Sequence, residues 1–66
     1  MRQEQLAALA EQRWANTEDS SHIRTGDDFA EMLESRGCYR DGAAVLLACE
    51  VGAVVTTGVS AYERVE

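Results

Sequence analysis

A chain of 66 residues that holds 12 acidic side chains, six arginines and no lysine has a formal net charge of −6. This charge argues against direct binding of nucleic acid, which needs clustered positive charge. The apolar content of 45% is too high for a disordered chain, and the length fits one small domain over residues 1–66. A domain of this size buries only about 60% of its unfolded surface. We therefore expect a homo-oligomer, because association adds buried apolar area.

The first segment, residues 2–17, is predicted to be a helix. Its composition of Gln, Glu, Ala and Leu favours helix strongly. Apolar residues recur at helical spacing along one side: Leu6, Leu9, Ala10 and Trp14. Arg13 lies inside this stripe, so the apolar face is narrow.

Residues 26–36 carry the clearest helix signals. Thr25 is placed to cap the free N–H groups of the first turn, and Asp27 and Asp28 lie where the helix dipole favours negative charge. Gly37 follows the last turn and can adopt the left-handed conformation that ends a helix. The apolar face consists of Phe29, Met32 and Leu33.

A third helix is predicted over residues 42–62, with Asp41 as its cap. Glu50 is the only charged residue between 43 and 61, and a helix that is apolar on every side is either a central buried helix or a membrane span. The predicted class is therefore all-α, with two short amphipathic helices around a longer apolar C-terminal helix. The alternative is a C-terminal β-hairpin, because residues 54–57 are β-branched and Thr57-Gly58 can turn the chain into residues 59–65.

Small and β-branched residues repeat along one side of this third helix and form the predicted oligomer interface: Ala44, Ala48, Gly52, Val55 and Val59. Small residues at this spacing let two helices approach closely. Residues 42–61 also have the length of a bilayer span, with Arg36 and Arg40 on the N-terminal side. Glu50 near the middle of this segment opposes a membrane location, because a carboxylate is costly there.

Acidic residues concentrate between residues 18 and 34, which hold −5 of the total charge of −6 and a single arginine, Arg24. Such a surface attracts a basic protein partner. The predicted partner-binding residues are Glu18, Asp19, Asp27, Asp28, Glu31 and Glu34. The competing interpretation is a hydrated face that keeps a small protein soluble.

Two charges of opposite sign interrupt apolar stripes, so Arg13 and Glu50 are predicted to form a buried ion pair, within one chain or between two. The alternative is that both side chains extend to the edge of the protein. If Cys38 and Cys49 lie on one helix, they are too far apart for a disulfide, and with His22 they make no metal set. The sequence holds no catalytic, cofactor-binding or metal-binding motif. We therefore expect no cofactor and no enzyme activity.

The function predicted from these observations is that of a small acidic regulator or inhibitor, which binds a basic protein through its second helix. Two alternatives are a single-span membrane protein anchored by residues 42–61, and an accessory subunit of a larger assembly. The start of the chain lacks the apolar core of a secretory signal peptide, so we expect a cytoplasmic location.

Overall fold

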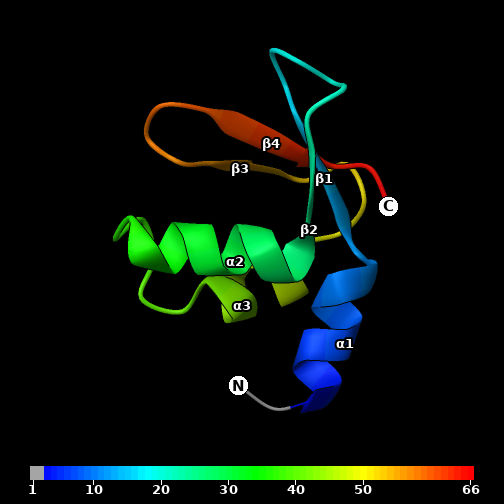
Figure 1. Cartoon of the computed structure of the whole chain (residues 1–66), viewed down its shortest axis with the longest axis vertical. Helices are drawn as coiled ribbons and strands as arrows, with labels where there is room; N and C mark the ends of the chain where they lie inside the picture. The colour runs from blue at the N-terminus through cyan, green and yellow to red at the C-terminus, as the bar shows by residue number, and fades with distance from the viewer. Residues whose placement is uncertain (1–2) are drawn as a thin grey trace.

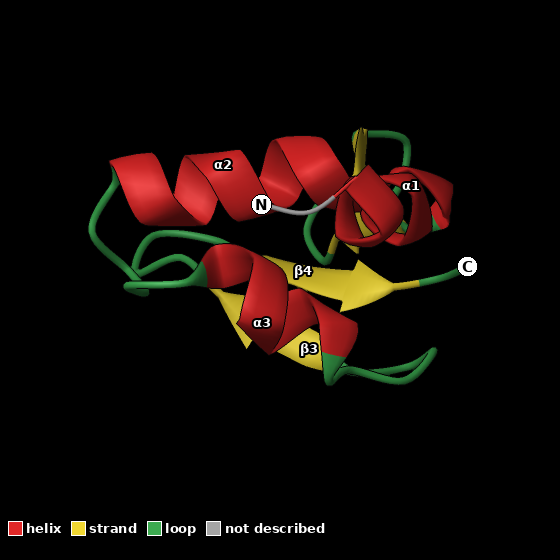
Figure 2. Ribbon diagram, turned by 90° about the horizontal axis from the view of Figure 1, so that it is seen from below, coloured by secondary structure: helices red, strands yellow, loops and turns green. Residues whose placement is uncertain are grey.

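The computed structural model describes residues 3–66, which form three helices and four strands in two layers (Figure 1). The elements are, in chain order, α1 (Gln3–Glu11), β1 (Arg13–Asn16), β2 (Ile23–Thr25), α2 (Gly26–Ser35), α3 (Gly42–Leu47), β3 (Val54–Thr56) and β4 (Ala61–Arg64). The strands form one antiparallel sheet in the order β2-β1-β4-β3. The helices lie on one face of this sheet, as the view from below shows (Figure 2).

The all-α prediction is wrong, and the first correction concerns residues 12–17. The predicted helix over 2–17 ends at Glu11, and its continuation is β1 (Arg2, at its start, lies outside the described residues). Trp14 pairs with Arg24 on one side and with Arg64 on the other, so β1 is a central strand. Pairing with residues distant in the sequence therefore overrides the local helical pattern.

The second correction concerns the predicted helix 42–62. Asp41 caps the start of α3 as predicted, because its Oδ1 accepts a hydrogen bond from the Ala44 N–H at 3.1 Å. The helix ends at Leu47, and the chain then turns at Gly52, whose φ of +97° suits glycine. The β-branched residues that follow form β3, and the hairpin alternative is thus partly consistent with the structure. Among the described residues, no helix is long and apolar enough to cross a membrane.

The residues of the predicted oligomer interface do not lie on one helix. Ala44 and Ala48 are exposed on α3 and at its C-cap, and Gly52 is in the following turn. Val55 is buried in β3, and Val59 is exposed in the hairpin turn. The predicted ridge of small residues is absent, because it depended on a continuous third helix.

Helix α2 follows the local signals closely. It spans Gly26–Ser35 with Thr25 at the N-cap position, although the Thr25 side chain makes no capping hydrogen bond. Gly37 has the expected left-handed conformation, with a φ of +74°. Its amide donates to the Glu34 carbonyl at 3.1 Å and so closes the last turn.

The core lies between the helices and the sheet and is centred on three aromatic rings. Trp14 is 0% exposed, and its ring centroid is 5.1 Å from that of Phe29. Phe29 in turn is 4.8 Å from Tyr62 of β4. Each helix contributes one fully buried leucine side chain: Leu9 from α1, Leu33 from α2 and Leu46 from α3. Every element except β2 therefore contributes a side chain to one apolar cluster.

A buried glutamine connects this core to α3. Gln12, 3% exposed, accepts a hydrogen bond from Trp14 Nε1 at 2.9 Å and donates one to the Leu46 carbonyl at 3.3 Å. The Gln12 carbonyl also accepts from the Gly26 N–H at 3.1 Å. These bonds satisfy polar groups that would otherwise be costly to bury.

Candidate functional site

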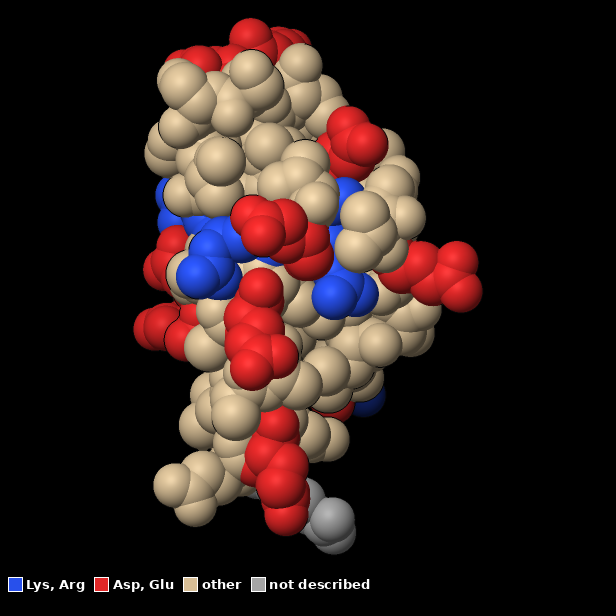
Figure 3. Space-filling view, turned by 90° about the vertical axis from the view of Figure 1, so that its right-hand side faces the viewer, with Lys and Arg blue, Asp and Glu red and all other residues tan. Residues whose placement is uncertain are grey.

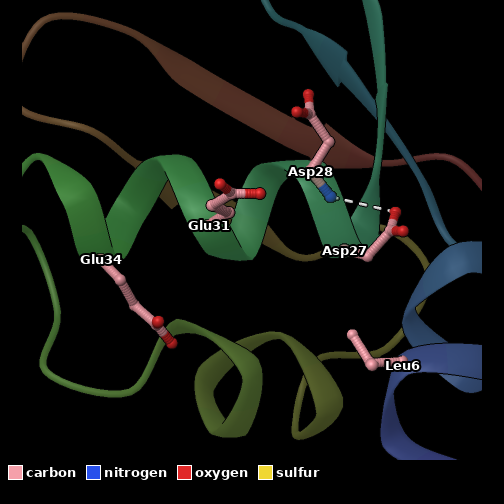
Figure 4. Close-up of a pocket in the computed structure, with 5 residues that line it drawn as sticks. All are labelled: Leu6, Asp27, Asp28, Glu31 and Glu34. Atoms are coloured by element: carbon pink, nitrogen blue, oxygen red, sulfur yellow. Dashed lines mark hydrogen bonds between the residues drawn. The ribbon is translucent and has the colours of Figure 1, made fainter. Parts of the chain in front are cut away.

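Four acidic residues of α2 line a surface hollow of about 370 Å³, and we call these residues the α2 acidic face: Asp27, Asp28, Glu31 and Glu34. Asp27, Glu31 and Glu34 lie one helical turn apart along the same side of α2 (Figure 4). Leu6 of α1 is the fifth lining residue and is 42% exposed. The hollow therefore combines negative charge with one apolar side chain at its edge.

The structure separates the other two predicted partner-binding residues from this face. Glu18 and Asp19 are exposed in the turn between β1 and β2. Glu18 lines a different hollow, formed with the β3–β4 hairpin. Asp19 Oδ1 accepts hydrogen bonds from the Ser21 hydroxyl at 2.6 Å and the Ser21 amide at 3.2 Å, which lower the pKa of Asp19. Asp19 thus stabilises its own turn.

Three of the four carboxylates have partners within the chain. Asp28 forms an ion pair with Arg24 at 2.6 Å. Glu34 Oε2 accepts from the Gly42 N–H at 2.8 Å and so satisfies an amide at the start of α3. Asp27 Oδ1 accepts from the Asp28 N–H at 3.0 Å. Glu31 is exposed and has no ion pair or hydrogen bond of its side chain within residues 3–66.

Arg24 connects the acidic face to the core. Its Nε donates to the Tyr62 hydroxyl at 3.3 Å, and its NH1 contacts Asp28. The Tyr62 hydrogen bond, together with Asp28, raises the pKa of Arg24 above its ordinary value. The guanidinium is therefore a fixed positive charge beside Asp28, at the β2 side of the face.

The charge on an adjacent surface is mixed. Figure 3 shows the side of the molecule on the right of Figure 1, where arginines gather near the middle and carboxylates lie around them. This surface offers both signs of charge to a partner. The α2 acidic face differs from it, because carboxylates and one leucine line its hollow.

The Thr25 hydroxyl lowers the pKa of Asp27 by a side-chain hydrogen bond, and the Asp28 amide acts in the same direction. A lowered pKa in the folded state stabilises the fold above the unfolded value of about 3.9, and this contribution is lost as the pH falls through the folded pKa. We expect Asp27→Asn to flatten the pH dependence of the free energy of unfolding in that acidic range. NMR titration of the Asp27 carboxylate measures the pKa directly, and a value at or above 3.9 would contradict the assignment. Thr25→Val should raise this pKa, because it removes the donor.

The predicted ion pair between Arg13 and Glu50 is not formed. Arg13 lies in β1, and its NH1 donates to the carbonyls of Ala10 at 2.6 Å and Gln12 at 3.0 Å. Glu50 is exposed in the loop after α3. Arg13 thus satisfies carbonyl groups at the end of α1, and Glu50 is hydrated rather than buried.

The structure brings no metal site together within residues 3–66. Cys38 and Cys49 are free and half-buried, and each thiol donates to a backbone carbonyl at 3.2 Å. His22 is exposed in the turn before β2, with its ring 6.1 Å from that of Tyr62. These three residues are distributed over the fold rather than gathered in one place.

Sequence reasoning missed one residue at the hollow and one in the core behind it. Leu6 belongs to the apolar stripe of the first helix, yet it lies at the hollow instead of in the core. Gln12 is a polar residue in a predicted helix, and its burial follows from the strand that begins at Arg13. No local signal marks either role, because both depend on how α1 meets α2. Comparisons with protein-family models, curated proteins and solved structures gave no match.

Proposed function

We propose that this chain acts by binding rather than by catalysis, as a small acidic regulator or inhibitor. In this proposal, the α2 acidic face meets a basic segment of a partner protein. The cytoplasmic location expected from the sequence is part of this proposal.

The observation that carries the proposal is that four acidic residues of one helix line a single hollow beside an exposed leucine. An arginine or lysine side chain has an apolar stem and a charged head. Its stem can rest on Leu6 while its head reaches the carboxylates across the hollow. The site thus offers both parts of a basic side chain a suitable contact.

The arrangement of the carboxylates adds to this argument. Asp27, Asp28 and Glu34 are held by hydrogen bonds within the chain, so their positions are set before a partner arrives. Preorganisation reduces the entropy that binding would otherwise cost. Glu31 has no competing partner within the described part of the chain and is available for a direct ion pair.

The experiment compares two variants with the same loss of charge. Asp27→Asn/Glu31→Gln/Glu34→Gln neutralises the face while keeping oxygen acceptors for the backbone amides. Glu50→Gln/Glu63→Gln/Glu66→Gln neutralises three exposed carboxylates elsewhere. Binding of an arginine-rich peptide is measured by calorimetry at two salt concentrations. We expect the face variant to weaken binding at least about tenfold, equivalent to about 1.4 kcal/mol, and the control variant to have little effect.

An equal loss in both variants would mean that the peptide responds to net charge alone, and the proposed face would be wrong. The same conclusion would follow if the wild-type chain failed to bind the peptide at low salt, where attraction between exposed charges is strongest. Circular dichroism of both variants verifies that they remain folded.

A further inference from the structure

Strand β3 has a free hydrogen-bonding edge. It is the last strand in the sheet order and pairs only with β4. The residues on either side of β3 are hydrogen-bonded toward β4: the Arg64 N–H donates to the Ala53 carbonyl, and the Thr57 N–H donates to the Ser60 carbonyl. Because bonded and non-bonded pairs alternate in antiparallel strands, the backbone groups of Val54 and Thr56 point away from β4. Both residues are exposed, Val54 to 57%.

This edge strand is short, with three residues, but it lacks the charge and the proline that usually protect an edge. Residues 51–62 contain no charged side chain, although the chain as a whole carries −6. Natural edges are commonly blocked by charge, proline or a bulge. The opposite edge strand, β2, carries Arg24 and leads directly into α2. A second copy of this acidic chain therefore meets the least repulsion at β3.

The sequence around β3 is nearly symmetrical about Val55. Residues at equal distances on its two sides are Val54 and Thr56, Ala53 and Thr57, Gly52 and Gly58, and Val51 and Val59. An antiparallel strand pair with its two-fold axis at Val55 sets Val54 opposite Thr56 of the other copy, and Ala53 opposite its Thr57, while the glycines lie where the chain turns away at either end of the strand. The sequence of this edge is thus complementary to itself, as an isologous interface requires.

We propose that β3 pairs antiparallel with β3 of a second copy and joins the two sheets into one. Val54 lies opposite the partner's Thr56, and each such pair exchanges both backbone hydrogen bonds. Gly52 and Gly58 flank the strand, and a Cβ at either position would meet nothing within 4 Å, so no side chain there blocks the approach.

The test measures molar mass by light scattering and sedimentation equilibrium over a range of concentrations. The wild-type chain should be a dimer. Val54→Lys/Thr56→Lys sets like charges opposite one another and should raise the dimer dissociation constant at least about tenfold. The control, Ile23→Lys/Val65→Lys, adds the same charge at two exposed apolar positions outside β3 and should remain dimeric.

Mixing the lysine variant with Val54→Glu/Thr56→Glu should restore a heterodimer, because each lysine then faces a glutamate. Failure of this rescue would contradict the proposed register. A wild-type chain that stays monomeric up to about 1 mM, or a dimer that survives the β3 lysines, would overturn the proposal. These variants leave the α2 acidic face unchanged, so this result is independent of partner binding.

Amide hydrogen exchange of the wild-type dimer tests the interface without any substitution. The N–H groups of Val54 and Thr56 should be protected at concentrations that favour the dimer and lose this protection on dilution. The Ile23 amide on the other edge strand serves as the internal reference. Exchange at Val54 and Thr56 that does not depend on concentration would count against the pairing.

Discussion

Replacing Trp14 with alanine is expected to lower the free energy of unfolding by about 3–5 kcal/mol. A domain of this length has a total stability of about 3–10 kcal/mol, so this variant approaches or crosses the limit of folding. The reason is the position of the indole, which is fully buried against Phe29 and hydrogen-bonded to Gln12. Urea unfolding followed by circular dichroism measures the effect.

Trp14→Phe is the informative companion variant. It keeps an aromatic ring near Phe29 but removes the donor to Gln12 Oε1, and leaving this buried oxygen unpaired should cost about 1–3 kcal/mol. Gln12→Leu leaves the indole N–H unpaired in the same way. Combining Trp14→Phe with Gln12→Leu should cost less than the sum of the two single changes. Strict additivity would show that the hydrogen bond makes no separate contribution.

Gly26→Ala is the second substitution with a large expected effect. A Cβ at this position would overlap the Leu9 carbonyl oxygen and crowd the Gln12 side chain at 3.0 Å. The ends of α1 and α2 would have to separate, and such overpacking typically costs about 1–3 kcal/mol. Gly42→Ala should behave alike, because its Cβ would lie 2.6 Å from the Ala30 carbonyl oxygen and force α3 away from α2.

Ser35→Ala is the control for the two glycine variants, because Ser35 is exposed in the last turn of α2. This substitution should change the free energy of unfolding by no more than about 0.5 kcal/mol. Thermal and urea unfolding of the three variants gives the comparison. If Gly26→Ala proved as stable as wild type, α1 and α2 would have to be farther apart than the structure places them.

The parts of the fold that the sequence predicts well are those set by local chemistry. Helix α2 lies between an N-cap threonine and a left-handed glycine, and Asp41 marks the start of α3. Strand β1 escapes prediction because Trp14 fits the spacing of the preceding helix. Its strand conformation depends on Arg64, fifty residues further along the chain. The β-branched residues of β3 indicated a strand, but an apolar run of this kind is equally compatible with a buried helix.

The same distinction applies to the candidate site. Helical spacing alone places Asp27, Glu31 and Glu34 on one side of α2. It does not reveal that Glu34 holds the start of α3, or that Leu6 of α1 completes the hollow. Glu18 and Asp19 are close to this face in sequence but are carried away from it by the turn between β1 and β2.

The central position of β1 also bears on how the chain reaches this fold. One neighbour of β1 in the sheet, β2, follows it closely in the sequence. The other neighbour, β4, is synthesised only after α2, α3 and β3. Closing the long loop between β1 and β4 costs conformational entropy, and this cost comes before the hydrogen bonds between the two strands can stabilise the fold. Until then the aromatic cluster lacks Tyr62, and Trp14 has no pairing partner on the β4 side of β1. A ribosome-bound chain that has not yet produced β4 would therefore keep one side of β1 unpaired, the state in which a small chain is most open to chaperones and proteases.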